Sequence, residues 1–357
     1  MKIGVLKEIK ESENRVSVTP EGVETLVKVG HKVFVEHNAG RAVGYPNLDY
    51  FDAGAEIVFS SPKEIYKTCD MIMKVKEPLP QEYELIRQNQ IIFTYLHLAA
   101  DKLLIKALIE KQCIAVAYET IEENGILPAL VPMSEIAGRM SIQQGAKYLE
   151  MEYGGSGVLL SGATGVQPGT VLILGGGTVG VEAARIANGI GAKVYVLESN
   201  IKKLDYLRKI LSTGCIVLQS TKQNIERLLK ISDLVIGAVY IVGAKAPKLI
   251  TRQMLKLMKK GSVIVDVSID QGGCFETSRP TTHRNPTFIE EGIVHYCVAN
   301  MPGAVAKTST LALTNATLPY ALKIANGDID LLNFSGTNIM NGKIIHTGVK
   351  EAYDRDS

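Results

Sequence analysis

Short apolar runs alternate with amphipathic segments along the chain, and this pattern predicts its secondary structure. Short apolar runs are typical of strands in a parallel sheet, and amphipathic segments are typical of the helices that connect such strands and cover both faces of the sheet. In the N-terminal part the expected strands are Ile3–Leu6, Val33–Val35, Ile57–Val58, Met71–Val75, Ile91–Tyr95 and Ile114–Ala117. The expected helices are Pro20–Val29, Leu48–Ala53, one beginning near Pro62, Gln81–Arg87 and Lys102–Lys111.

The pattern of the second half is clearer and predicts a six-stranded sheet. Its expected strands are Val171–Leu174, Val194–Leu197, Ile216–Leu218, Leu234–Val239, Val263–Val267 and Ile293–Val298. Helices are expected at Lys202–Leu211, Asn224–Ile231 and Thr251–Met258. Six strands with helical crossovers are typical of the doubly wound dinucleotide fold, in which ligands lie at the carboxyl ends of the strands.

The prolines at 128–132 interrupt the first pattern and indicate a crossing between domains. A long helix is expected at Met133–Tyr153, and another at Thr310–Ala325 with a kink at Pro319. If the latter returns to the first sheet, the first domain is discontinuous. The expected fold class is therefore α/β, with a six-stranded Rossmann domain at 129–305 and a discontinuous flavodoxin-like domain at 1–128 and 306–357. In the tail only Lys343–Ile345 is predicted to be a strand.

Bulk properties exclude several function classes. A net charge of +2 gives no footprint for nucleic acid or an anionic membrane, and no apolar run is long enough to span a bilayer. The start of the chain is too polar for a signal peptide. The five cysteines are scattered without a C-x-x-C pair, so we expect a reduced, cytoplasmic protein whose cysteines are mostly small buried apolar residues. No metal site is expected.

A glycine cluster follows the strand Val171–Leu174 at once. Gly175, Gly177 and Gly180 fit G-x-G-x-x-G where a strand turns into a helix, which is the context that a pyrophosphate-binding turn requires. Glu198 ends the next strand, where a carboxylate binds the ribose hydroxyls. Because ligands in this fold lie at the carboxyl ends of the strands, residues at these ends are further candidates, a criterion called here the strand-end rule. It adds these candidate cofactor-binding residues: Ser220, Val239, Tyr240, Val267, Ser268, Asp270, Val298, Ala299, Asn300 and Met301.

Charged residues also follow strands of the first sheet. Lys76 follows Met71–Val75 and His97 follows Ile91–Tyr95, so the two meet at one sheet edge if those strands are neighbours. Arg15 follows the first strand by a short loop. Together with Asp270, this set suits a small anionic substrate that undergoes hydride transfer coupled to proton transfer. Each residue also has a structural explanation: a surface charge, a structural histidine or a turn cap. The alternation of Lys74 and Lys76 leaves open which lysine acts.

Several segments resemble bacterial L-alanine dehydrogenases, which belong to one superfamily with the N-terminal domain of transhydrogenase. They include Lys7–Val16, Met73–Pro80, Phe93–Ala100, Pro132–Arg139, Gly243–Pro247, Val265–Gly273 and Ala299–Ala304. The resemblance runs from Met1 to about Ile324 and weakens in the tail, where the chain ends earlier than most members.

The resemblance implies reversible oxidative deamination of L-alanine to pyruvate and ammonia with NAD. Arg15 and Lys76 would bind the substrate, and His97 and Asp270 would be the acid–base pair. The register selects Lys76 over Lys74. It also implies a homo-oligomer, a hexamer in this family. Positions that match dinucleotide contacts of the family are Ser134, Thr178, Val179, Glu198, Lys203, Ser220, Val239, Ile269, Asp270, Arg279, Asn300 and Met301.

Glu198 stands where the family more often has aspartate, and its carboxylate predicts NAD over NADP. Lys202 and Lys203 keep NADP open, because a nearby base can accommodate the 2′-phosphate. Two alternative functions also remain open. One is a related amino or keto acid dehydrogenase with a larger pocket. The other is an NAD(H)-binding hydride carrier like the soluble domain of proton-translocating transhydrogenase, although such a carrier has no use for the Arg15, Lys76, His97 and Asp270 set.

Overall fold

The computed structural model describes residues 1–239 and 246–355, and the chain divides into two compact units. The first unit consists of Met1–Met133 and Val305–Ser357, and the second of Ser134–Ala304. Each has its own parallel sheet and its own buried core, so the units are described one at a time. The first unit is discontinuous in sequence, as the expected fold class requires.

The first unit is built on an eight-stranded sheet in the order β15-β14-β6-β5-β4-β1-β2-β3. Strands β1 to β6 are parallel to one another, whereas β14 and β15 are antiparallel additions at one edge. The strands are β1 (Lys2–Val5), β2 (Lys32–Glu36), β3 (Glu56–Val58), β4 (Met71–Met73), β5 (Ile91–Thr94), β6 (Ile114–Ala117), β14 (Thr337–Met340) and β15 (Lys343–Ile344). The central strands β4 and β5 are buried throughout, because helices cover both faces of a parallel sheet.

The helices of this unit begin where local chemistry favours a helix start. They are α1 (Pro20–Lys28), α2 (Asn47–Asp52), α3 (Pro62–Thr68), α4 (Pro80–Tyr83), α5 (Lys102–Glu110), α11 (Ala306–Asn326) and α12 (Thr347–Arg355). Single 3₁₀ turns occur at Arg41–Val43 (η1), Leu98–Ala100 (η2) and Tyr118–Thr120 (η3). The side chains of Thr19 and Ser61 cap α1 and α3, and a proline at the first helical position follows each cap.

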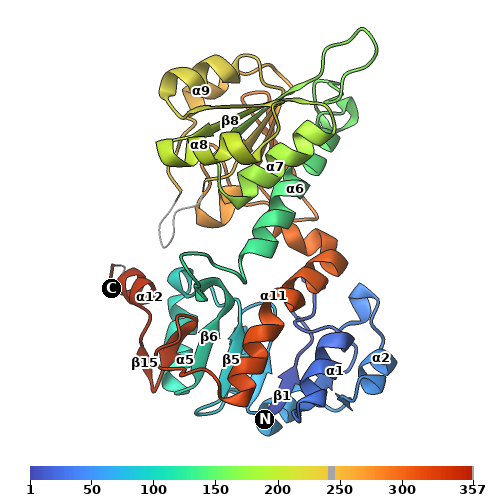
Figure 1. Ribbon diagram of the computed structural model, residues 1–357, viewed down its shortest axis with the longest axis vertical. Coiled ribbons are helices and arrows are strands. Elements are labelled where there is room, and N and C mark those ends of the chain that lie inside the picture. The colour runs from blue at the N-terminus through green and yellow to red at the C-terminus, as the bar shows by residue number, and fades with distance from the viewer. Residues whose placement is uncertain (240–245, 356–357) are drawn as a thin grey trace. The chain divides into compact units, whose positions relative to one another are not determined.

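The C-terminal segment completes the first unit. Helix α11 contains Pro319, as predicted, and it contacts α1. Strand β14 then pairs with β6, and α12 contacts η2. Figure 1 shows β15 and α12, in red, on the same side of the unit as α5 and β6. The predicted strand at Lys343–Ile345 is confirmed as β15, but β14 was not predicted. Thr337–Met340 lacks a clear alternation of apolar and polar residues, and its pairing depends on a strand more than two hundred residues earlier.

The second unit has a seven-stranded sheet in the order β12-β13-β11-β10-β7-β8-β9. Six strands are parallel, and β12 is an antiparallel edge strand. The strands are β7 (Thr170–Leu174), β8 (Lys193–Glu198), β9 (Cys215–Gln219), β10 (Leu234–Gly237), β11 (Val263–Asp266), β12 (Thr287–Glu290) and β13 (Ile293–Tyr296). The helices are α6 (Val131–Tyr148, beginning in the first unit), α7 (Thr178–Gly189), α8 (Ile201–Ile210), α9 (Lys222–Leu229) and α10 (Arg252–Leu255), with 3₁₀ turns Met151–Tyr153 (η4), Val267–Gln271 (η5) and Met301–Val305 (η6).

The six parallel strands confirm the doubly wound dinucleotide order. The first unit has the same order, since β3-β2-β1-β4-β5-β6 is the 3-2-1-4-5-6 arrangement. It therefore differs in strand order from flavodoxin, whose sheet runs 2-1-3-4-5. Nothing in the alternation of strands and helices distinguishes these two orders.

Helix α6 ends earlier than the apolar pattern predicts. It stops at Tyr148 rather than Tyr153, because the chain folds back on the end of the helix. The amides of Gly155 and Gly157 donate to the carbonyls of Glu150 and Leu149, respectively. Elsewhere, the five cysteines are buried free thiols. Within the described ranges, the model contains no helix with the length and hydropathy needed to cross a membrane.

Candidate active site

The carboxyl edge of the first sheet brings the predicted residues of β4 and β5 together. The two strands are parallel neighbours, with Met73 opposite Phe93, which confirms the arrangement on which the prediction depended. The pairing continues beyond the strands: the Tyr95 amide donates to the Val75 carbonyl at 3.3 Å. The Thr94 hydroxyl donates to the Lys76 carbonyl at 2.9 Å. The turn that carries Lys76 is thus fixed against β5.

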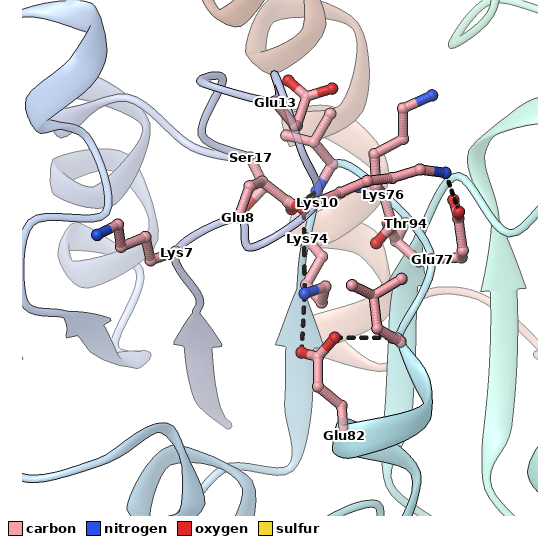
Figure 2. Close-up of polar contacts among 12 residues, drawn as sticks. Lys7, Glu8, Lys10, Glu13, Ser17, Lys74, Lys76, Glu77, Glu82 and Thr94 are labelled. Atoms are coloured by element: carbon pink, nitrogen blue, oxygen red, sulfur yellow. Dashed lines mark hydrogen bonds and ion pairs between the residues drawn. The ribbon is translucent and has the colours of Figure 1, made fainter.

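Lys74 and Lys76 have different surroundings, which separates their roles. The Lys74 side chain is 1% exposed, and its ammonium lies 2.8 Å from a Glu82 oxygen and 3.9 Å from a Glu8 oxygen. Lys76 is only partly buried, and its side chain points away from that of Lys74 (Figure 2). A lysine held inside the protein by two carboxylates is structural, so Lys76 is the better candidate for binding a ligand.

Arg15 is almost fully buried and already has a carboxylate partner. Its Nε and Nη2 donate to the two oxygens of Glu13 at 2.7 and 2.6 Å, and its Nη1 lies 3.1 Å from the Met133 sulfur. Burial alone would lower the pKa of the guanidinium, but the hydrogen bonds and charge of Glu13 outweigh it and raise that pKa. Arg15 is therefore not the surface charge that its type often is. Beside it, the Ser17 hydroxyl donates to the carbonyl of Met73, which ties this loop to the end of β4.

His97 is held in a conformation that few residues other than glycine adopt. Its φ of 49° lies in the left-handed region. The Glu119 carboxylate accepts the amides of His97, at 2.6 Å, and of Leu96, at 3.1 Å. The ring stacks on Tyr95 with 5.9 Å between centroids and an interplanar angle of 17°. An exposed ring on a fixed backbone suits a group that exchanges protons with a ligand.

Sequence reasoning missed the carboxylates that hold this edge together. Glu8, Glu13 and Glu119 accept main-chain or guanidinium hydrogens from Lys76, Arg15 and His97, respectively. The strand-end rule that selected the cationic residues would also have selected Glu8, which lies three residues after the end of β1. The same rule would have selected Glu119, which follows β6 by two residues and lies in η3, but nothing in the sequence indicates that its carboxylate accepts the main-chain amide of His97.

In the second unit, the glycine turn has the geometry that the motif predicts. Gly175 has a φ of 102°, and a methyl group on Gly180 would lie 1.9 Å from the Gly175 carbonyl oxygen, so helix and strand pack too closely for a side chain. Gly177 is the N-cap of α7, and a Cβ there would meet no atom within 4 Å. The first turn of α7, including Thr178 and Val179, thus has amides that no cap side chain covers. This is the cradle that a dinucleotide pyrophosphate fits.

Ser134 lies one helical turn before Gly138 on α6, so the two share a helix face. A Cβ on Gly138 would lie 2.4 Å from the Val179 carbonyl oxygen, which means that α6 packs tightly on the first turn of α7. Ser134 is therefore close to the predicted pyrophosphate cradle.

Glu198 is fixed by the main chain around it. One oxygen accepts the amides of Ser199 and Asn200, and the other accepts the Gly176 amide at 3.1 Å and lies 3.4 Å from the Lys203 ammonium. Burial raises the pKa of the carboxyl, but these amides and Lys203 outweigh it and lower that pKa. The side chain is therefore a carboxylate at neutral pH, next to the cradle.

Asp270 is exposed on the 3₁₀ turn η5, directly after β11. The fully buried Asp266 organises this turn by accepting the amides of Ser268 and Cys274 and the Ser278 hydroxyl. The Ser268 hydroxyl donates to the Val239 carbonyl at 2.7 Å, which links the loops after β10 and β11. Val267 and Ile269 belong to the same turn, whereas Tyr240 lies outside the described residues.

Of the remaining predicted cofactor residues, all except Arg279 lie near carboxyl ends of strands. The Ser220 amide donates to the Glu198 carbonyl. After β13, Val298 and Met301 are buried and Ala299 and Asn300 partly buried, and Asn300 has a φ of 64°. Arg279 is exposed, and its guanidinium lies 4.3 Å from the centre of the Phe288 ring.

Comparisons with known proteins identify the family of the chain. The family model described as "Alanine dehydrogenase/PNT, N-terminal domain" matches residues 4–137, and that described as "Alanine dehydrogenase/PNT, C-terminal domain" matches residues 141–351. An alanine dehydrogenase of Methanococcus maripaludis is 53% identical over 99% of this chain and 97% of its own length. Alanine dehydrogenase 2 of Staphylococcus aureus is 50% identical over 100% of the chain and 97% of its own length.

Solved structures give the same picture. An L-alanine dehydrogenase structure superposes with a TM-score of 0.95 at 47% identity and covers 100% of both chains. A transhydrogenase from Sinorhizobium meliloti, at 23% identity, has a TM-score of 0.83 over 97% of this chain and 99% of its own, which shows a shared fold. The expected end of the resemblance near Ile324 was wrong, because the family match continues to residue 351 and the relatives align along nearly their full length. The chain belongs to the alanine dehydrogenase/PNT family.

Proposed function

We propose that this protein catalyses the reversible oxidative deamination of L-alanine to pyruvate and ammonia with NAD as hydride acceptor. The observation that carries the proposal is the pairing of β4 with β5, which brings Lys76 and His97 to one sheet edge in a chain of this family. Relatives with about half of their residues identical are named alanine dehydrogenases. The glycine cradle and Glu198 support NAD as the cofactor.

Arg15 and Lys76 would bind the substrate in this proposal. The Arg15 guanidinium meets the weakly accepting Met133 sulfur through Nη1, and a substrate carboxylate is a stronger acceptor for that N–H group. Lys76 would bind the carbonyl oxygen of pyruvate or the corresponding centre of alanine. Both groups are cationic, which suits a small acid.

His97 and Asp270 would be the acid–base residues. In the forward direction the alanine nitrogen loses a proton and the Cα–H bond breaks, so that iminopyruvate forms. Water then adds to the C=N bond, and ammonia leaves as the carbonyl of pyruvate forms. Bound NAD would supply the acceptor for the hydride. His97 would take and return protons at its exposed ring, and Asp270 would be the second proton-exchanging group.

The function is tested by measuring NADH oxidation by the purified protein with pyruvate and ammonia, without any partner protein. We expect turnover by the wild type, and a fall in kcat of about 10²- to 10⁴-fold in His97→Ala, the usual size of an acid–base contribution. Protein that binds NADH but shows no turnover would instead favour a hydride carrier. A panel of larger 2-oxo acids in the same assay separates alanine dehydrogenase from a related enzyme with a larger pocket.

Substrate binding is tested with two lysine variants. Lys76→Ala should raise the KM for pyruvate, since it removes a cation at the sheet edge. Lys7→Ala is the matched control, because Lys7 follows β1 on the same edge and its exposed side chain points away from Lys76 (Figure 2). An equal rise of KM in both variants would contradict the assignment, because it would mean that overall charge rather than position matters.

We also propose that the protein acts in the cytoplasm as a homo-oligomer, a hexamer as is usual in the family. The five buried free thiols are consistent with a reducing compartment. Light scattering of the purified protein measures the assembly directly, and a monomeric mass would overturn the oligomer.

A further inference from the structure

The turn that carries Lys76 leaves the ladder between β4 and β1 before Lys76 is reached. Strand β1 ends at Val5, and the registered pairing of β1 with β4 ends at Met73. Beyond this point the carbonyls of Val75 and Lys76 bond to the β5 side of the turn. The amides of the same two residues face the β1 side, where no strand continues. Buried amides need an acceptor, so something must replace the missing strand.

The side chain of Glu8 supplies that acceptor. One oxygen, Oε1, accepts the Val75 amide at 2.6 Å and the Lys76 amide at 3.3 Å. The other, Oε2, lies 3.9 Å from the Lys74 ammonium. The Glu8 side chain is 2% exposed, so neither contact is exchanged readily with water. Figure 2 shows Glu8 between the backbone of this turn and Lys74, with Glu82 beyond.

We propose that Glu8 is a positioning residue for substrate binding, whose carboxylate fixes the Val75–Lys76 main chain so that Lys76 is presented to the substrate. This deepens the proposed function and rests on the role that it gives Lys76. Glu8 touches neither substrate nor cofactor in this proposal. Its effect should therefore appear in the KM for the 2-oxo acid far more than in kcat or in NADH binding.

The same geometry gives the positioning a pH dependence. Burial, the largest cause, raises the pKa of Glu8 to about 7, against the opposing effects of Lys74 and the Val75 amide. A protonated carboxyl is a weaker acceptor than a carboxylate, so protonation loosens the turn. The affinity for the 2-oxo acid should therefore fall as the pH drops below about 7.

Other charged or titratable groups interact with Glu8 from the surrounding elements. They are Lys74 after β4, Glu13 and Arg15 in the loop after β1, Tyr66 on α3 and Tyr118 on η3. Burial lowers the pKa values of Lys74 and Arg15, but the neighbouring carboxylates outweigh it and raise both pKa values, so both side chains stay cationic. Burial raises the pKa values of both tyrosines well above their ordinary value, so both stay neutral. The two cationic groups and the two tyrosines therefore keep one charge state around pH 7.

Steady-state kinetics with pyruvate tests the proposal. Glu8→Gln keeps the shape of the side chain but is permanently uncharged, and we expect a rise in the pyruvate KM of about tenfold, with kcat within about twofold. Glu8→Ala removes the acceptor and should raise the KM further. Glu36→Gln is the matched control, because the Glu36 carboxylate accepts a main-chain amide at 2.9 Å from Lys7, a residue that has no role in the proposed substrate binding. An unchanged KM in Glu8→Gln, or an equal rise in Glu36→Gln, would overturn the positioning role.

Lys76→Ala, measured alongside, separates the two proposals. If its KM is unchanged, the role given to Lys76 fails whatever the Glu8 variants do. If its KM rises while that of Glu8→Gln does not, only the positioning role of Glu8 fails.

A binding experiment isolates the pH effect. It can be decided with protein that keeps Glu8, so it remains informative if a Glu8 variant fails to fold. The probe is oxamate, an unreactive isostere of pyruvate, titrated into NADH-loaded His97→Ala protein so that the histidine does not contribute. With Glu8 present, the Kd of oxamate should rise by about an order of magnitude from pH 8 to pH 6. Glu8→Gln in the same background should show a flat profile. A flat profile with Glu8 present would overturn the pH dependence even if Glu8→Gln failed to fold.

Discussion

The carboxyl edges of the two sheets are held together by different interactions, although the six parallel strands have the same order in both sheets. The edge of the first unit is held by buried charged side chains, with Lys74 between Glu8 and Glu82, and Arg15 against Glu13. The glycine turn of the second unit is held by main-chain geometry, in which Gly175 and Gly180 pack against each other without side chains.

The difference follows from what each edge would bind. A small 2-oxo acid offers few atoms, so charged side chains must be placed accurately to recognise it, and buried partners limit their movement. A dinucleotide pyrophosphate is large and anionic, and helix amides can receive it without a cationic side chain. The first edge should therefore be sensitive to charge and pH, whereas the second should be sensitive to added volume.

Lys74→Met should have the largest effect on stability. The substitution leaves Glu8 and Glu82 buried without their ammonium, and breaking a buried pair costs about 3–5 kcal/mol. Urea unfolding followed by circular dichroism measures the loss. The control is Lys209→Met, because Lys209 pairs with Asp205 at an exposed site on α8, where such pairs contribute about 0.3–0.5 kcal/mol. Equal losses in the two variants would contradict the contrast between buried and exposed charge.

The pH dependence of stability should come next, at about 3 kcal/mol between pH 4.5 and 7. Burial raises the pKa of Glu8 from 4.5 to about 7, so in this window the folded protein keeps a proton that the unfolded chain has released. The free energy of unfolding contributed by Glu8 therefore falls as the pH rises, and changes no further above pH 7. Glu8→Gln lacks this contribution, and its stability relative to wild type should rise across the window.

Urea unfolding of both proteins at pH 5, 6 and 7 checks this expectation, and a difference that is independent of pH would contradict it. If the difference appears, the folded protein is less stable with Glu8 deprotonated, which is the state that positions Lys76, than with Glu8 protonated. Such a cost at a functional site is common, because a well-placed binding group often requires an unfavourable environment.

The sequence predicted the scaffold and the cationic residues better than it predicted their supports. Lys76 and His97 follow apolar runs that identify β4 and β5, so the strand-end rule selected them. Glu119 also follows a predicted strand, but its role could not be predicted, because its contact with the His97 amide depends on how η3 packs. Strand β14 was missed for a similar reason, since its partner β6 is distant in sequence. Tertiary contacts between short or polar segments have no local pattern.

Gly180→Ala should weaken NADH binding at the second edge. The new methyl group would lie 1.9 Å from the Gly175 carbonyl oxygen, so the turn must shift. Overpacking of this kind costs about 1–3 kcal/mol, which corresponds to a rise in the Kd of about 5- to 150-fold. Gly189→Ala is the matched control on the same helix, because a Cβ there meets no atom within 4 Å. NADH fluorescence titration measures the Kd of both variants, and similar Kd values would show that the glycine turn tolerates an added methyl group.

The smallest effect is expected at Glu198, where the second edge does use a charge. Its carboxylate should repel the 2′-phosphate of NADP, and Lys203 only partly offsets this because it lies 3.4 Å from the carboxylate and remains partly exposed. Glu198→Gln removes the repulsion and frees Lys203, so the ratio of kcat/KM for NADP to that for NAD should rise about tenfold, or about 1.4 kcal/mol. Asp205→Asn, an exposed carboxylate on α8, serves as the control and should leave the ratio unchanged. A wild-type preference for NADP would contradict this assignment. It would mean that Lys203 recognises a phosphate despite its carboxylate neighbour, and that this edge depends on charge as strongly as the first.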